Sequence, residues 1–291
     1  MMIWRFLPFR QSNAFENMAI DEAIFRENQR TESPPTLRFY RWFPPAISMG
    51  YFQEVWNEVD VEACTRYGID IVRRPTGGKA VLHEHDLTYA VVAKVNNPLF
   101  PPDIPGTYRI ISGCISDCLS EFGIETEMTI SGRSSQDDAL KASCFSTPSQ
   151  YELLVKKRKI CGSAQVRSRS VFLQHGSLLL EFDPLKTCEV LLPHHDNHKT
   201  QVEKMRRSVT SVYGETGLDA DIGTLCRVLK KCFEKRLGIT LVEGDLNPEE
   251  EALKTRLVRD KYMNTKWNME GKGVVHGYKD AGSDRLPSLH S

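Results

Sequence analysis

Apolar residues recur at the 3.6-residue spacing of a helix in several stretches of the chain. Residues 12–27 place apolar side chains on one side, with Asn13 as a capping residue. Residues 107–122 carry the clearest stripe, which Gly123 ends. A further stripe lies at residues 222–233. We expect the apolar side of each helix to face a common core.

Shorter apolar runs bounded by turn residues indicate strands. The predicted strands cover residues 37–40, 46–49, 69–72, 87–93, 151–155, 160–166 and 171–182. Residues 87–93 are almost continuously apolar, so we expect that strand to be buried. Strands followed by helices predict an α+β fold, with a mainly antiparallel or mixed sheet flanked by helices. We predict one domain over residues 1–270, helical from about 184 to 270, and a flexible tail over 271–291.

The bulk composition narrows the classes of function. In the 291-residue chain, apolar residues make up 40% and charged residues 26%, as in an ordinary globular protein. Lys+Arg and Asp+Glu both total 38, and this charge balance argues against nucleic-acid binding. No apolar run reaches the roughly 18 to 20 residues needed to cross a membrane, and residues 1–10 lack the pattern of a signal peptide. We therefore expect a cytoplasmic protein without membrane contact.

The chain contains eight cysteines, none of them in a C-x-x-C pair. In the cytosol they should be reduced thiols, mostly small core residues. Cys114 and Cys118 lie four residues apart on a predicted helix, but no Cys/His pair nearby completes a set of zinc ligands. We therefore expect no bound metal.

Three segments place reactive or charged groups beside glycine near strand ends. The first is RRPTGGKAVLH, which contains Arg73, Arg74, Thr76, Gly77, Gly78 and His83. Glycines after a strand let the backbone approach a ligand closely, and the basic side chains favour an anionic or polarised ligand. From these residues alone, a simple turn that binds nothing is the alternative.

The second segment is SCFSTPS, in which Cys144 lies between a polar loop and a proline-containing turn. Such a cysteine can be exposed, as a nucleophile must be, but from position alone a small structural residue is the commoner case. The third segment pairs RKICGSAQ with QHGS and contains Lys159, Gly162, His175 and Gly176. Lys159 either points into the fold from a strand or lies on the surface with the basic turn before it.

Together these segments resemble the lipoate-attachment family, which is related in fold to the biotin protein ligases. Within it, the chain is most similar to the LipM-type octanoyl-[acyl-carrier-protein]:protein N-octanoyltransferases. The resemblance rests on WRF, NMAIDEA, RFYRWFPPAISMGYFQ, RRPTGGKAVLHEHDLTYAVV, SCFSTPSQYELLV, RKICGSAQ and QHGSLLLEF, in family order. With the KW that precedes Asn268, they span roughly residues 4 to 268, and they imply a lipoate/biotin protein ligase catalytic-domain fold.

The resemblance implies an acyltransferase of lipoate biosynthesis. Such enzymes take octanoyl from the phosphopantetheine thioester of acyl carrier protein and pass it to one lysine of a lipoyl-domain protein, typically the glycine-cleavage H protein. Cys144 matches the family cysteine that forms a thioester intermediate, and Lys159 matches the family lysine. A thioester is already activated, so the implied reaction needs no ATP and no cofactor. The predicted substrate-binding residues are Arg73, Arg74, Thr76, Gly77, Gly78, His83, Gly162, His175 and Gly176.

These residue types suit the implied chemistry. A thiolate attacks a thioester readily, and an ammonium beside it favours the thiolate and stabilises the oxyanion that develops. Burial of the eight-carbon chain would contribute about 0.8 kcal/mol per methylene. Arg73, Arg74 and Lys79 either dock the acidic carrier protein or its phosphate, or act within the fold. The group that takes the proton from the acceptor amine stays open, with His83 and His175 as candidates.

The alternative function is that of an ATP-dependent lipoate or octanoate ligase. Those ligases usually carry three consecutive glycines in the loop, whereas the third position here is Lys79. They also generally have a C-terminal accessory domain, for which we expect this chain to be too short. The segment around Cys144 is a feature of the transferases. Because no large apolar stripe demands a partner, we expect a monomer.

Overall fold

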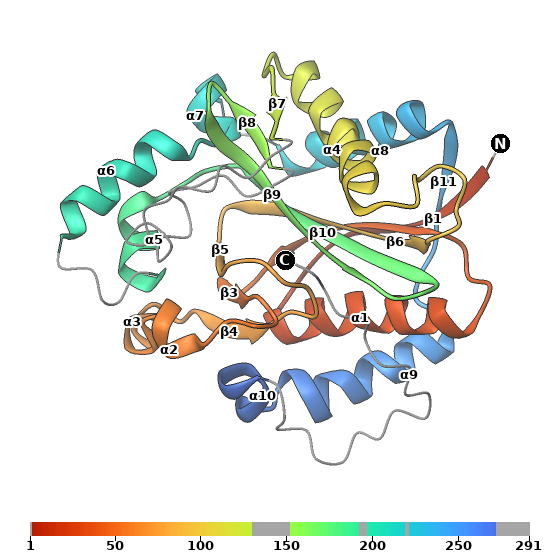
Figure 1. The fold of residues 1–291 in the computed structure, drawn as a ribbon, viewed down its shortest axis with the longest axis horizontal. Coiled ribbons are helices and arrows are strands. Elements are labelled where there is room, and N and C mark those ends of the chain that lie inside the picture. The colour runs from red at the N-terminus through yellow and green to blue at the C-terminus, as the bar shows by residue number, and fades with distance from the viewer. Residues whose placement is uncertain (1, 130–151, 192–196, 219–220, 272–291) are drawn as a thin grey trace.

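The main sheet has eight strands in the described part of the chain, in the order β11-β1-β2-β6-β10-β9-β8-β7 (Figure 1). The computed structural model describes residues 2–129, 152–191, 197–218 and 221–271. The strands are β1 (Met2–Ser12), β2 (Thr36–Trp42), β6 (Asp86–Lys94), β7 (Glu127–Met128), β8 (Leu153–Val155), β9 (Arg158–Arg167), β10 (Val171–Leu179) and β11 (Ile239–Glu243). Pairing is parallel between β11, β1 and β2 and antiparallel from β2 to β7. The predicted α+β fold with a mainly antiparallel sheet is confirmed.

A second, three-stranded sheet has the order β4-β3-β5. Its strands are β3 (Ala46–Met49), β4 (Asp70–Arg73) and β5 (Val81–His83). The helices are α1 (Ala14–Arg30), α2 (Val55–Glu58), α3 (Val61–Tyr67), α4 (Ile104–Glu121), α5 (Pro184–Leu191), α6 (His198–Ser208), α7 (Val212–Thr216), α8 (Ile222–Leu237), α9 (Pro248–Leu257), the π-helical turn η2 (Val258–Tyr262) and α10 (Thr265–Glu270). None of these helices has the length and apolar character required to span a bilayer.

Helices cover both faces of the main sheet: α4 and α8 pack on one face, and α1 and α9 on the other (Figure 1). The strand β6 touches both layers. Its residues Leu87, Tyr89 and Val91 belong to the α4/α8 cluster, whereas Ala90 and Val92 belong to the α1/α9 cluster. Successive residues of a strand point to opposite faces, so this strand is continuously apolar because both of its faces are covered.

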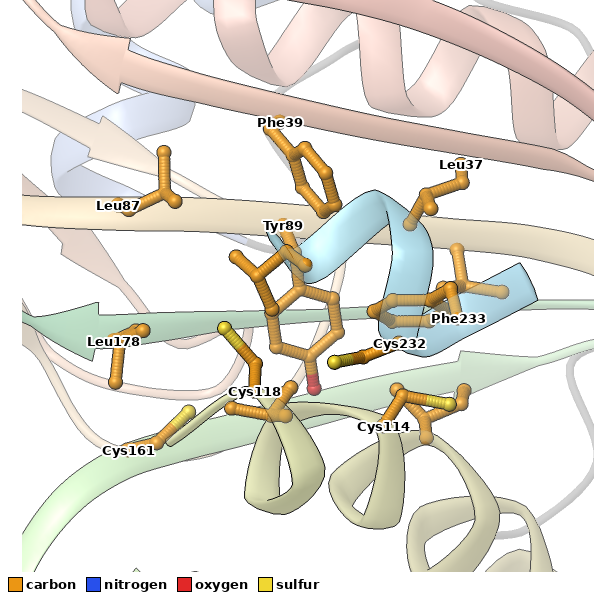
Figure 2. Close-up of a cluster of buried hydrophobic side chains, with 14 of the residues drawn as sticks. Leu37, Phe39, Leu87, Tyr89, Cys114, Cys118, Cys161, Leu178, Cys232 and Phe233 are labelled. Carbon is orange, nitrogen blue, oxygen red and sulfur yellow. The ribbon is translucent and has the colours of Figure 1, made fainter. Parts of the chain in front are cut away.

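Buried thiols form part of the α4/α8 layer (Figure 2). Cys114 and Cys118 of α4 and Cys232 of α8 lie among aromatic side chains that include Phe39 and Tyr89. Each of these three thiols is less than a tenth exposed. The prediction that most cysteines are small core residues is confirmed here.

The sequence patterns did not predict β1 or β11. Pro8 lies within β1, and the pairing of β1 with β2 shifts register between Leu7 and Arg10. Proline cannot donate to a sheet, and such an irregularity is where a sheet tolerates it. The strand β11 begins directly after Gly238, whose φ of 63° ends α8, and it pairs with β1 at the other end of the chain. Because these two strands are paired across almost the whole length of the chain, neither segment alone has a pattern that predicts the pairing.

Glu22 ties α1 to the C-terminal helices. Its carboxylate accepts hydrogen bonds from Lys261 Nζ, at 2.7 and 2.9 Å, and from the Tyr262 hydroxyl. It also pairs with Arg26 at 2.6 Å. Burial alone would raise the pKa of Glu22, but the charges of Lys261 and Arg26 and these hydrogen bonds lower it from 4.5 to about 2.

We expect Glu22→Gln to flatten the acid side of the stability profile. Because the folded-state pKa of Glu22 lies below its unfolded value, the wild type loses this contribution as the pH falls from 4.5 towards about 2. The shift corresponds to roughly 3 kcal/mol of unfolding free energy at neutral pH. Urea unfolding of both proteins across this pH range measures the effect. A difference between them that is constant with pH would contradict the assignment.

Candidate active site

A pocket of about 140 Å³ is lined by residues of both sheets. Part of its wall is apolar, formed by Met18, Tyr40, Trp42, Ala80, Val81 and Ala164. The rest is polar or charged and includes Ser48, Arg74, Lys79, His83, Glu152, Lys159, His175 and Ser177. Such a wall can enclose an apolar chain whose polar end lies beside charged groups.

Arg74 attaches the glycine loop to the second sheet. Its guanidinium donates to the carbonyl oxygens of Gly77 at 2.7 Å, Lys79 at 2.8 Å and Ser48 at 2.7 Å. The residue is only 5% exposed. Of the two roles considered for Arg74, docking an acidic partner and acting within the fold, this burial and these contacts favour the second.

Two glycines allow the loop to pass close to β3. Gly78 has a φ of 88°, which side chains rarely adopt. A Cβ added to Gly50 would lie 1.8 Å from the Gly78 carbonyl oxygen, so a side chain at position 50 would displace the loop. Gly50 was not among the predicted site residues, although it stands in the motif SMGYFQ.

On one side of the loop, a hydrogen-bonded chain runs from α1 to Arg74. Asp21 is fully buried and accepts from Arg38 at 2.8 Å and from the Tyr40 hydroxyl at 2.9 Å. Asp21 also contacts His175 Nδ1 at 3.0 Å. His175 Nε2 lies 2.7 Å from the Thr76 hydroxyl, which accepts from Arg74 Nε. Burial lowers the pKa of His175, against the opposing effect of Asp21, and this favours the neutral ring.

A matching chain reaches Arg74 from β6. Asp86 contacts His83 Nδ1 at 2.8 Å and accepts from the hydroxyl of Ser177 at 2.7 Å. His83 Nε2 lies 2.8 Å from the Ser48 hydroxyl, which accepts from Arg74 at 3.1 Å. Burial alone would raise the pKa of Asp86, but His83 and the hydroxyl donors lower it.

The end groups fix the direction of both chains. A carboxylate only accepts and a guanidinium only donates, so each histidine donates from Nδ1 to its aspartate. Each hydroxyl accepts a hydrogen bond from Arg74, and toward a neutral imidazole it is the donor of the hydrogen bond to Nε2. Both ring nitrogens of His83 and of His175 are therefore engaged within the fold.

Lys159 reaches the pocket because of a bulge in β9. Leu154 pairs with Lys159 whereas Leu153 pairs with Cys161, so Ile160 is the additional residue. Ile160 and Cys161 both belong to the α4/α8 core, although they are consecutive. Lys159 is thereby turned to the opposite face, where it lines the pocket. Of the two predicted placements for Lys159, the structure has the inward one.

Gly162 leaves the space that the Lys159 side chain occupies. A Cβ added to Gly162 would lie 2.6 Å from Lys159 Cε and 2.8 Å from Nζ. The ammonium contacts the Glu152 carboxylate at 2.5 Å. A side chain would also clash at position 176, because a Cβ added to Gly176 would lie 2.5 Å from the Tyr89 ring. The sequence analysis did not predict Glu152 as a site residue. Glu152 lies seven residues before Lys159, and only the bulged β8–β9 hairpin brings the two side chains together.

The remaining predicted site residues do not all line the pocket. Arg73 instead donates to backbone carbonyls of Gly50, Gln53 and Asn268, and it holds α10 against β4. Thr76 is a fully buried residue of the loop, and its hydroxyl lies within hydrogen-bond distance of His175 Nε2. Gly77 contributes its carbonyl to Arg74. The predicted binding roles of these residues remain predictions.

The cysteines within the described ranges are poor nucleophiles. Each is free and buried. Burial raises the pKa of Cys161, Cys64 and Cys188, to about 12, about 12 and about 11 respectively. It also raises the pKa of the others, Cys114, Cys118, Cys226 and Cys232. The predicted nucleophile, Cys144, lies outside the described residues. Within them, no group of three or more His, Cys, Asp or Glu side chains could hold a metal ion.

Residues 13–234 match the family model of the lipoyl protein ligase A/B catalytic domain. The chain belongs to this family. Curated members similar to it include the Octanoyltransferase LipM of Geobacillus kaustophilus, which is 36% identical over 92% of this chain and 98% of that protein. The Octanoyltransferase LipM of Symbiobacterium thermophilum is 39% identical over 91% of this chain and 98% of that protein.

Solved structures of the family share the fold. The bipartite lipoate protein ligase of Thermoplasma acidophilum has a TM-score of 0.76 and 26% identity, covering 92% of this chain and 97% of that one. A lipoate-protein ligase A bound with ATP has a TM-score of 0.75 and 28% identity, covering 92% of this chain and 99% of that one. The predicted family and fold are therefore confirmed.

We expect Arg74→Lys to loosen the glycine loop. Lysine cannot replace the forked donors that join the loop, the two hydroxyls and β3. Loss of hydrogen bonds from a buried charged group should lower the unfolding free energy by about 2–4 kcal/mol. Hydrogen exchange of the amides at residues 76–80 should accelerate. The control is Arg167→Lys, because Arg167 donates to Pro102 and Thr107, away from the loop. Unchanged exchange in the loop would contradict the role of Arg74.

Proposed function

We propose that this protein is an octanoyltransferase of lipoate biosynthesis. It moves octanoyl from the thioester of acyl carrier protein to a lysine of a lipoyl-domain protein, through a thioester on Cys144. The observation that carries the proposal is the ammonium of Lys159 in the pocket wall. The chain around it is 33–39% identical to curated octanoyltransferases over more than nine-tenths of its length.

The pocket suits both halves of an octanoyl thioester. The apolar wall, with Met18 and Trp42, offers cover for the eight-carbon chain. Lys159 supplies the positive charge that favours a thiolate and stabilises the oxyanion of the tetrahedral adduct. The other cysteines within the described ranges are buried with raised pKa values. This leaves Cys144 as the thiol to be tested.

The ATP-dependent ligase is the weaker alternative. Solved ligases of the family share the fold, but at 26–28% identity they are less similar to this chain than the octanoyltransferases are. Lys79 lines the pocket at the position where ligases usually have a third glycine. A lysine there would occupy space beside a nucleotide phosphate.

The acceptor is a lipoyl-domain protein. The Thermoplasma acidophilum ligase was solved as part of a system with its E2 lipoyl domain, and this supports an acceptor of the same kind. The donor, octanoyl-acyl carrier protein, and the glycine-cleavage H protein as the particular acceptor follow from the family resemblance. They belong to the proposal.

We expect Cys144→Ser to abolish octanoyl transfer from octanoyl-acyl carrier protein to the H protein, a loss of at least about 10³-fold, because it removes the nucleophile. Mass spectrometry of the wild type without acceptor should locate the octanoyl group on Cys144. The control is Cys226→Ser, on α8 and outside the pocket. An adduct on another cysteine would refute the mechanism. A requirement for ATP and free octanoate would favour the ligase.

We expect Gly162→Ala to reduce kcat/KM by about 10- to 100-fold while the protein stays folded, since the new methyl group displaces the Lys159 ammonium. The control is Gly223→Ala on α8, where the nearest atom to an added Cβ is 3.5 Å away. Steady-state transfer assays and thermal unfolding of both variants provide the comparison. Wild-type kcat/KM in Gly162→Ala would show that the position of Lys159 does not matter.

A further inference from the structure

Helix α6 concentrates positive charge on its exposed side. It contains the exposed cations Lys199, Lys204, Arg206 and Arg207 and a single carboxylate, that of Glu203. In the whole chain, by contrast, basic and acidic residues balance at 38 each. Arg206 pairs with Glu203 at 2.9 Å. The other three cations make no ion pair with a carboxylate in the part of the chain that the structure describes.

The stability of α6 itself does not account for these cations. A cation is favourable in the last turn of a helix, where Arg206 and Arg207 lie, but unfavourable in the first turn. Lys199 lies in the first turn of α6, which has no acidic residue. The helix is instead anchored by the buried residues Val202 and Met205, which pack against α5. Its opposite, basic side is therefore available to another molecule.

The C-terminal end of α6 is joined to the strand that carries Lys159. Val209, directly after the helix, forms an isolated parallel bridge with Lys159, and the Thr210 amide donates to the Lys159 carbonyl at 2.8 Å. Figure 1 shows α6 beside α5 at one edge of the molecule. Thr187 of α5 lines a hollow of about 50 Å³, and this hollow shares Lys159 and Gly162 with the main pocket. The basic helix thus adjoins the pocket wall.

The charge of this surface discriminates between the two substrates of the proposed function, on which this inference rests. The acceptor brings a lysine ammonium, which a basic surface repels. The acyl group of the donor hangs from a phosphopantetheine arm, and its carrier protein is acidic. The cations from Lys199 to Arg207 extend over about 12 Å of helix, more than one phosphate group covers. A protein surface with several carboxylates therefore fits α6 better than the phosphate alone.

The smaller hollow is not the place for that anionic contact. The side chains of Glu181 and Asp183 line it, and they would repel a phosphate or a carboxylate. Arg73 and Arg74, which the sequence suggested for docking, are 1% and 5% exposed and are bonded within the fold. Neither can contact a carrier protein without leaving those bonds.

We propose that the exposed side of α6, formed by Lys199, Lys204 and Arg207, is the docking surface for the acyl carrier protein. Carboxylates of the carrier protein contact these three cations, and this holds the carrier beside the pocket that receives its acyl group. The cations act by attraction and orientation at the rim of the complex, where charges set the encounter rate and the choice of partner. They do not touch the reacting atoms.

Binding of the holo-carrier protein, which has the arm but no octanoyl group, tests this surface without turnover. The variant of the full chain carries Lys199→Gln, Lys204→Gln and Arg207→Gln. At low salt we expect its Kd for the carrier protein to rise about tenfold, because three exposed ion pairs are lost. At high salt, which screens exposed charges, the two proteins should bind alike. Fluorescence anisotropy of labelled carrier protein measures both.

The matched control removes three exposed cations from another helix. Arg227→Gln, Lys231→Gln and Lys235→Gln lie on α8, and none of these residues lines the pocket. This variant loses the same net charge, so its Kd should stay within about twofold of the wild type if the position of the charge decides binding. Thermal unfolding verifies that both variants are folded. Unchanged binding by the α6 variant, or an equal loss in both variants, would overturn the proposal.

A donor without a carrier protein separates docking from chemistry. Octanoyl-N-acetylcysteamine has the thioester but neither phosphate nor protein, so the α6 variant should keep kcat/KM for it within about twofold, whereas kcat/KM for octanoyl-acyl carrier protein falls about tenfold. An equal fall with both donors would overturn the proposal, because α6 would then act on the pocket itself. Weakened binding of the H protein, or of a random-sequence RNA, in place of the carrier protein would also overturn it. A wild type that binds the carrier protein but transfers octanoyl from neither donor would overturn the proposed function and support the docking surface.

Discussion

A single buried guanidinium holds this site together. An unpaired buried charge is destabilising by several kcal/mol, so Arg74 can exist at this position only if its donors are all used. They are used on the Gly77 and Lys79 carbonyls, on Ser48 and on the Thr76 hydroxyl. The loop, β3 and the two histidines are thus arranged around one side chain. Through the two hydroxyls and the two histidines, Arg74 is also connected to the buried carboxylates of Asp21 and Asp86.

This arrangement divides the polar residues of the pocket by task. Histidine is a common catalytic residue, yet both ring nitrogens of His83 and of His175 contact a buried aspartate and a hydroxyl group that Arg74 also contacts. The ion pair of Glu152 and Lys159 lies on a different element, the β8–β9 hairpin, and does not share partners with Arg74 among the contacts described above.

The sequence predicted the elements whose causes are local. The Asn13 cap is confirmed by its 2.9 Å bond to the Glu16 amide, and the apolar run of β6 is buried as expected. The failures have distant causes: β1 and β11 stabilise each other across the length of the chain. In the site, motif matching found Arg74, His83, Lys159 and His175 but assigned no support role to Asp21 or Asp86. Asp21 lies 154 residues from His175, so only the folded chain shows their contact. Asp86 is only three residues from His83, but nothing in that spacing predicts that its carboxylate turns back to the histidine ring.

The bulge at Ile160 explains why the pocket could not be read from strand alternation. A regular strand would place Lys159 and Cys161 on one face, so that the core would receive a lysine or the pocket would receive a buried thiol. Because of the extra residue, the side chains of Ile160 and Cys161 both point into the core, and the side chain of Lys159 points to the opposite face, where it lines the pocket. Gly162 then continues the strand without a side chain, and this is the space that the ammonium takes. The bulge thus allows β9 to contribute side chains both to the core and to the wall of the pocket.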